Sequence, residues 1–135
     1  MRFWAVVLVV VLVFGGGAKL VAASADKVKE ASERAAKDYL NHGLILAGEG
    51  HYENAAKSFR KALAIMPQWA EAHSLLGSAL AQSGNFREAE EELRKAVALK
   101  PDYAEGWYSL GNFLKDRGKE AEAQEAFKKA KQYQR

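Results

Sequence analysis

Apolar residues along most of the chain follow the spacing of amphipathic helices that come in pairs. Between residues 70 and 83, Leu76, Ala79 and Leu80 lie at i, i+3 and i+4, so they form one apolar stripe on a helix. Residues 86–100 carry a second stripe of this kind. The pattern therefore predicts two helices joined by a short turn.

This pattern returns every 34 residues, and four small residues and a proline keep the same spacing. The equivalent positions are Gly43, Gly77 and Gly111; Gly50, Gly84 and Gly118; Ala55, Ala89 and Ala123; Ala62, Ala96 and Ala130; and Pro67 and Pro101. A fixed period of this length indicates stacked supersecondary units. We therefore expect an all-α fold built from repeated helix pairs, a design that presents a surface.

The small residues have physical roles in this pattern. Gly84 can take the positive φ that ends a helix, and Pro101 ends the next one because it lacks an N–H group. Gly77 and Ala89 are expected where the two helices of one pair approach closely, and Ala96 where the second helix meets the next repeat. A larger side chain at such a contact costs about 1–3 kcal/mol.

The repeated positions resemble the tetratricopeptide repeat, which carries a W-x2-L-G-x2-Y segment, then A, F and A, then P. The best copy has Trp107, Leu110, Gly111, Leu114, Ala123, Phe127 and Ala130. His42 replaces the usual Leu in the first copy, and His73 the usual Trp in the second, which we expect to loosen the first repeat interface. The resemblance covers residues 36–135 and implies a right-handed α-solenoid of three helix-turn-helix repeats, at 36–69, 70–103 and 104–135.

In tetratricopeptide repeat proteins the first helix of each repeat lines a concave groove that binds another protein. The resemblance places these residues there: Lys37, Leu40, Asn41 and Leu44; Glu71, Ser74, Leu75 and Ser78; Glu105, Tyr108, Asn112 and Lys115. Leucines and Tyr108 make this groove partly apolar, and its amides and hydroxyls can bond a peptide backbone. It suits an amphipathic helix or an extended apolar segment. The alternative is that some of these residues pack against neighbouring helices.

Chaperone-binding members of the family clamp a terminal carboxylate with Lys, Asn and Arg. At those positions this chain has Leu40, Leu44, Leu75, Glu105 and Ser109. The clamp is therefore missing, and Glu105 would repel a carboxylate. The final helix, at residues 121–135, is polar enough to cover the end of the solenoid, although Phe113, Phe127 and Tyr133 can leave an apolar patch there.

The N-terminal segment, residues 1–25, supports two interpretations. Residues 3–14 are continuously apolar behind Arg2, and Ala23-Ser24-Ala25 is a small-x-small cleavage site, as in a secretory signal peptide; Gly16-Gly17-Ala18 is a second possible site. A membrane span needs about 20 mostly apolar residues, which residues 3–23 supply if Lys19 reaches towards the head groups.

Because the chain begins at Met1 and retains this segment, we expect an uncleaved, single-pass membrane anchor. Residues 26–35 are rich in helix formers and predict a helical neck that continues into the first repeat. A short basic start before an apolar run is typical of export, so we expect the repeats on the periplasmic or extracytoplasmic side. Counting Lys and Arg around the span favours the cytoplasmic side instead. The alternative is a secreted or periplasmic soluble adaptor released by cleavage.

Charge and composition narrow the function further. Of the 20 basic residues 18 follow position 25, together with all 17 acidic ones, so the repeat region has a net charge near +1. The charges alternate in sign, and no basic stripe with interleaved aromatic residues occurs, which argues against nucleic-acid binding. The chain has no cysteine, so disulfides and a lipid-anchored lipoprotein are excluded.

Residues able to support catalysis are sparse. His42, His51 and His73 are the only histidines, and none has a metal-ligand type of neighbour at i+3 or i+4. His42 and His73 are expected at core positions; an enzyme that uses this pair with a metal is the alternative of a different class. We expect no cofactor, no metal and no enzymatic activity. The favoured interpretation is an interaction scaffold, a membrane-anchored accessory subunit whose N-terminal helix can also contact a membrane protein complex.

Overall fold

The computed structural model describes the backbone of residues 2–134 and the side chains of residues 16–134. Within residues 2–134 it contains six α-helices: α1 (Arg2–Gly48), α2 (Tyr52–Ile65), α3 (Ala70–Gln82), α4 (Phe86–Leu99), α5 (Ala104–Asp116) and α6 (Glu120–Tyr133). The predicted all-α class is confirmed. The chain divides after Arg34 into two compact units, and the second unit holds the repeats.

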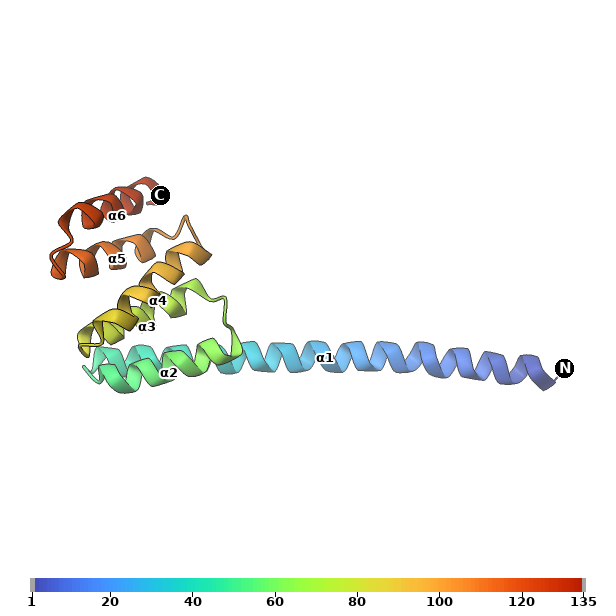
Figure 1. The fold of residues 1–135 in the computed structure, drawn as a ribbon. Helices are drawn as coiled ribbons and strands as arrows, with labels where there is room; N and C mark the ends of the chain where they lie inside the picture. The colour runs from blue at the N-terminus through green and yellow to red at the C-terminus, as the bar shows by residue number, and fades with distance from the viewer. Residues whose placement is uncertain (1, 135) are drawn as a thin grey trace. The chain divides into compact units, whose positions relative to one another are not determined.

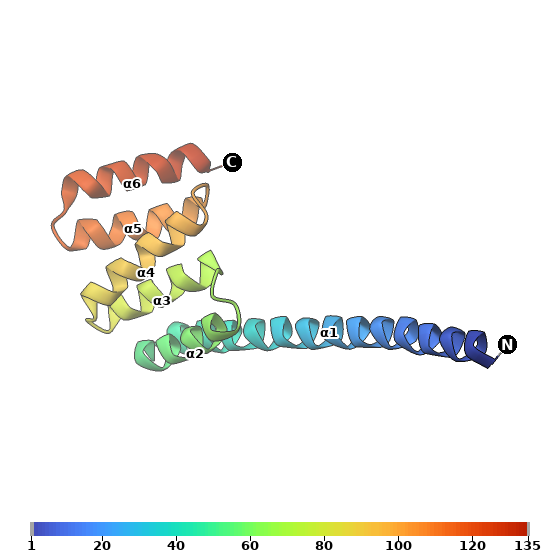
Figure 2. The same ribbon diagram turned by 45° about the vertical axis from the view of Figure 1, so that its right-hand side comes forward.

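The second unit is a series of helical hairpins (Figures 1 and 2). Helix α3 lies beside α4 and α5 lies beside α6, while α3 also packs against α2 and α5 against both α3 and α4. The last turns of α1 pair with α2, as the close approach of Gly43 in α1 to the ring of Phe59 shows. These hairpins stack into a solenoid-like fold.

The hairpin turns use the glycines that the sequence assigned to them. Gly50, Gly84 and Gly118 have φ values of +83°, +89° and +76°, a conformation that residues with a Cβ rarely adopt. After each glycine the chain closes the turn onto the preceding helix; for example, the Asn85 N–H donates to the Leu80 carbonyl over 2.9 Å.

The two helices of each hairpin approach closely at one glycine. A Cβ atom at Gly77 would lie 2.6 Å from Cγ of Leu93 and 3.0 Å from the carbonyl oxygen of Ala89. The predicted close approach of Gly77 and Ala89 is therefore present. The equivalent contacts in the other repeats join Gly43 to Phe59 and Gly111 to Phe127.

His73 occupies the position that Trp107 has in the next repeat. Trp107 donates its Nε1–H to the Pro101 carbonyl over 2.8 Å, and Nε2 of His73 lies 2.8 Å from the Pro67 carbonyl. His73 is 4% exposed, and its Nδ1 lies 2.5 Å from a carboxylate oxygen of Glu92. The imidazole therefore reproduces the link that the indole makes to the inter-repeat loop, so the expected loosening at this position is not observed.

Ion pairs connect the second helices of successive repeats. Arg60 contacts Glu88 at 2.6 Å, and 34 positions later Arg94 contacts Glu122 at 2.7 Å. Arg94 also contacts Glu90 at 2.8 Å, and Lys119 contacts the same carboxylate at 3.0 Å. The hydrogen bond from Lys119 and the charge of Arg94 hold the pKa of Glu90 below its ordinary value of 4.5, although partial burial opposes this.

Helix α1 runs from Arg2 to Gly48, so the predicted neck continues as helix into the first repeat. In the part of the chain whose side chains are described, no helix is long and apolar enough to cross a membrane. The apolar core of the predicted anchor, residues 3–14, lies outside those residues, and the anchor or signal assignment is not supported by the structure.

We expect Gly77→Ala to lower the free energy of unfolding by about 1–3 kcal/mol, because the new methyl group must displace Leu93 or the backbone at Ala89. Urea denaturation followed by circular dichroism measures this change. Gly48→Ala is the matched control, since nothing lies within 4 Å of its added Cβ. Equal destabilisation by both substitutions would contradict the close-approach explanation.

We expect Glu90→Gln to lower the free energy of unfolding at neutral pH, because it removes the charge that Arg94 and Lys119 contact. The change should be about 1 kcal/mol, since the carboxylate is partly exposed. The folded-state pKa is depressed, so this stabilisation is present above pH 4.5 and is lost as the pH falls through the folded-state value. Urea denaturation of both proteins across the acid range should show their difference disappearing. The control Glu91→Gln, whose partner Arg87 is 3.7 Å away and 95% exposed, should change stability less.

Candidate partner-binding groove

The first helices of the repeats supply the predicted groove, and α3 and α5 pack directly against each other. The twelve predicted groove residues differ in exposure. The exposed ones are Lys37, Asn41, Leu44, Glu71, Glu105, Tyr108 and Lys115. The half-buried ones are Leu40, Leu75, Ser78 and Asn112, and the buried one is Ser74, which is 4% exposed. Ser74 therefore offers almost no surface to a partner.

A cleft of about 230 Å³ lies between α3 and α5. Ser78 of α3 and Asn112 of α5 both line it, together with the apolar side chains of Ala81, which is half-buried, and Phe86, which is 40% exposed. Among the described residues, neither Ser78 nor Asn112 makes a side-chain hydrogen bond to another side chain or to the backbone. Both polar groups are therefore available to the backbone of a bound segment.

The leucines of the groove expose less apolar surface than the sequence predicted. Leu44 is 42% exposed, whereas Leu40 and Leu75 are half-buried and pack against the core. Leu44 is therefore the residue of this set that offers the most surface for an apolar contact.

Two residues that the sequence did not assign to the groove also line the cleft. The guanidinium of Arg117 lies 3.9 Å from the centre of the Phe86 ring, a cation–π arrangement at the end of the cleft. Phe86 begins α4 after the turn at Gly84, and Arg117 follows the last residue of α5, just before Gly118. Both therefore lie outside the first helices to which the family pattern assigns partner contacts. A search of the turn residues for a cation and an aromatic ring could have found them.

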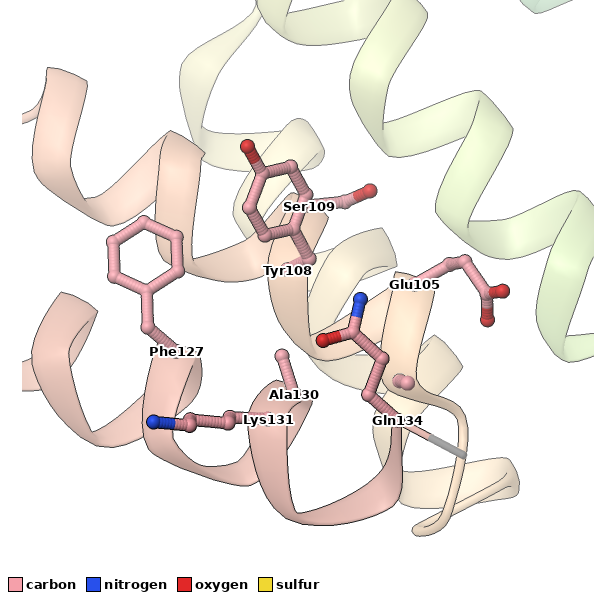
Figure 3. A pocket seen from close by; sticks show the side chains of 8 residues that line it. Glu105, Tyr108, Ser109, Phe127, Ala130, Lys131 and Gln134 are labelled. Carbon is pink, nitrogen blue, oxygen red and sulfur yellow. The ribbon is translucent and has the colours of Figure 1, made fainter.

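Tyr108 and Glu105 line a second, larger pocket of about 590 Å³ between α5 and α6 (Figure 3). The ring centre of Tyr108 lies 5.7 Å from that of Phe127, and Tyr108 is 57% exposed. These two predicted groove residues thus belong to the end of the solenoid, together with Ala130 and Lys131 of α6.

Acidic side chains surround the first turns of α3 and α5. Burial, with a smaller contribution from the charges of Glu71 and Glu105, raises the pKa of the Tyr103 hydroxyl above its ordinary value of 10.0.

The histidines do not converge. His42, expected at a core position, is exposed, and His73 is engaged by Glu92 and Pro67. Among the residues with described side chains, no group of three His, Asp or Glu residues could hold a metal ion.

Two family models match the chain, and each describes a tetratricopeptide repeat: one over residues 46–112 and the other over residues 104–135. A sequence comparison with curated proteins gave no match. Solved structures do match. The crystal structure of MamA is 28% identical, with a TM-score of 0.69, and the match covers 81% of this chain and 64% of MamA.

Two other solved structures show the same fold. The second repeat domain of Spaghetti (RPAP3), bound to the HSP90 peptide SRMEEVD, has a TM-score of 0.72 at 20% identity and covers 80% of this chain and 99% of its own. The Sgt2 domain from Aspergillus fumigatus has a TM-score of 0.70 at 24% identity and covers 73% of this chain and 65% of its own. The repeats, the hairpin geometry and the matched family models together show that this chain belongs to the tetratricopeptide repeat family.

Proposed function

We propose that this protein is a non-catalytic interaction scaffold whose groove binds an apolar helical or extended segment of another protein. The observation that carries the proposal is the cleft between α3 and α5, where Ser78 and Asn112 lie beside the accessible apolar side chains of Ala81 and Phe86. A bound backbone can satisfy these two polar groups while its side chains contact the apolar surface.

The character of the groove favours an apolar partner over an acidic one. The HSP90 peptide in the Spaghetti complex, SRMEEVD, is acidic at its C-terminal end. In this chain the positions of the carboxylate clamp carry leucines, a serine and Glu105, and Glu105 is exposed. Bringing a carboxylate close to Glu105 sets like charges against each other.

We propose further that residues 1–25 attach the repeats to a membrane, with the repeats on the extracytoplasmic side, so that a bound partner is held there. Residues 3–14 contain no charged or polar residue, and the helical neck connects this segment to the first repeat. An accessory subunit of a membrane complex would have this arrangement. A soluble adaptor released by cleavage after Ala25 is the alternative.

Replacing Leu44 and Leu75 together by glutamate should reduce partner capture at least about tenfold, since charge is placed on the apolar part of the groove. The full-length tagged chain is used in mild detergent, and captured proteins are quantified by mass spectrometry. Because Leu75 also packs against the core, Leu44→Glu alone is the second variant and should weaken capture with unchanged helicity. Ala98→Glu, on an exposed position of α4, is the control.

Capture that is unaffected by Leu44→Glu and by the double variant would contradict a role for this groove. Binding of the peptide SRMEEVD is a separate check, and we expect none at concentrations at which the Spaghetti domain binds it.

The intact mass of the protein purified from cell membranes tests the anchor. We expect the full-length mass and retention in the membrane fraction after a high-salt wash, because salt weakens ionic attachment and leaves apolar insertion in place. A protein trimmed after Ala18 or Ala25 and recovered without detergent would instead support the soluble adaptor.

A further inference from the structure

The pocket between α5 and α6 is equivalent to the surface of α3 and α4 against which α5 packs. Shifted back by 34 positions, Phe127 becomes Leu93, Ala130 becomes Ala96 and Tyr108 becomes Ser74. Those three residues are 1%, 0% and 4% exposed, and α5 packs against the two helices that carry them. In the last repeat, by contrast, Tyr108 is 57% exposed and the pocket is open (Figure 3).

The first repeat helix, at the end of α1, has the complementary bare face. Shifted forward by 34 and 68 positions, Ile45 corresponds to Ala79 and Phe113, which are 3% and 6% exposed. Ile45 itself is 60% exposed. His42 is exposed as well, whereas Leu76 and Leu110 at its equivalent positions are each 2% exposed. Residues that face a preceding repeat elsewhere in the chain thus face solvent here.

We propose that these two faces bind each other between copies, so that residues 36–48 of one copy pack into the α5–α6 pocket of the next. The contact continues an interface that the chain already contains twice. Inside the chain, Phe113 of α5 and Leu93 of α4 line one cleft. In the junction between copies the equivalent pair is Ile45 and Phe127, and both are apolar.

Charge complementarity favours a second copy over an apolar helix of another protein. Lys131 stands at the position of Val97 and Asp38 at that of Gly106; Val97 of α4 and Gly106 of α5 are both buried, and these two helices pack together. An apolar helix would bring no acidic group to the exposed Lys131 ammonium, and covering a charge without adding a partner is costly. A second copy brings Asp38 to this region of the junction, so the acid and the base compensate each other.

The junction joins different faces of the two copies, so it is heterologous. If one copy packs on the next as one repeat packs on the next inside the chain, each added copy lengthens the solenoid. Both ends of the growing chain then keep a face that can bind a further copy. Such contacts generate open chains whose length rises with concentration.

Mixing two variants tests this arrangement. Ile45→Glu spoils one face and Tyr108→Glu the other, and both residues are exposed enough for the fold to be retained. Light scattering on the full-length chain in mild detergent, with the detergent mass subtracted, gives the size. We expect a concentration-dependent series for the unchanged chain and for the control Ala98→Glu, and monomers for either variant alone. An equal mixture should form dimers of one copy of each and nothing larger.

Charge reversal gives a second measurement. Asp38→Lys and Lys131→Asp should each weaken association about tenfold, and the chain that carries both should recover it. Circular dichroism checks that every variant keeps its helicity. An unchanged chain that stays monomeric up to its solubility limit, a mixture that stays monomeric, or a double variant without recovery would each overturn the proposal.

Discussion

Each hairpin of the repeat unit depends on the contact between a glycine of its first helix and a large side chain of its second. Gly43 faces Phe59, Gly77 faces Leu93 and Gly111 faces Phe127, and in each pair an added Cβ would come within 2.7 Å of the partner. This contact sets the distance between the helices, and the alanines that surround it keep that distance short. The inter-repeat ion pairs and the cleft between α3 and α5 join different hairpins, so they form between the units that these contacts hold together.

The second and third repeats solve one packing problem with different residues. Trp107 fills its site and donates to Pro101, and position 126 beside it is a buried alanine. His73 is smaller, and Glu92, which stands at the position of Ala126, occupies the remaining space and bonds the imidazole. The exchange keeps the bond to the inter-repeat loop and replaces apolar volume by a polar contact. Departures from the family pattern can therefore come in compensating pairs.

The fold could be predicted because period, turn glycines and close-approach positions are all local features of the sequence. The groove residues were harder to predict, because equivalent positions of the repeat differ in burial. Ser74 and Tyr108 are equivalent, yet Ser74 is buried by the next repeat and Tyr108 is exposed at the end of the solenoid. The same reason explains His42, which is exposed because no preceding repeat among the described residues covers it. Leu40 and Leu75 were predicted as partner contacts, but part of their surface is used by the core.

The ion pairs between second helices are unevenly distributed, and this affects how the domain opens. Between α4 and α6, Arg94 and Lys119 share Glu90, and Arg94 also contacts Glu122, whereas α2 and α4 are joined by the ion pair of Arg60 and Glu88. In a stack where each repeat contacts only its neighbours, stability is a sum of repeat and interface contributions. These ion pairs are partly exposed and add modestly to the interface of the last two repeats. We therefore expect local opening to begin in the first repeat, where Leu44 and Ile45 are exposed.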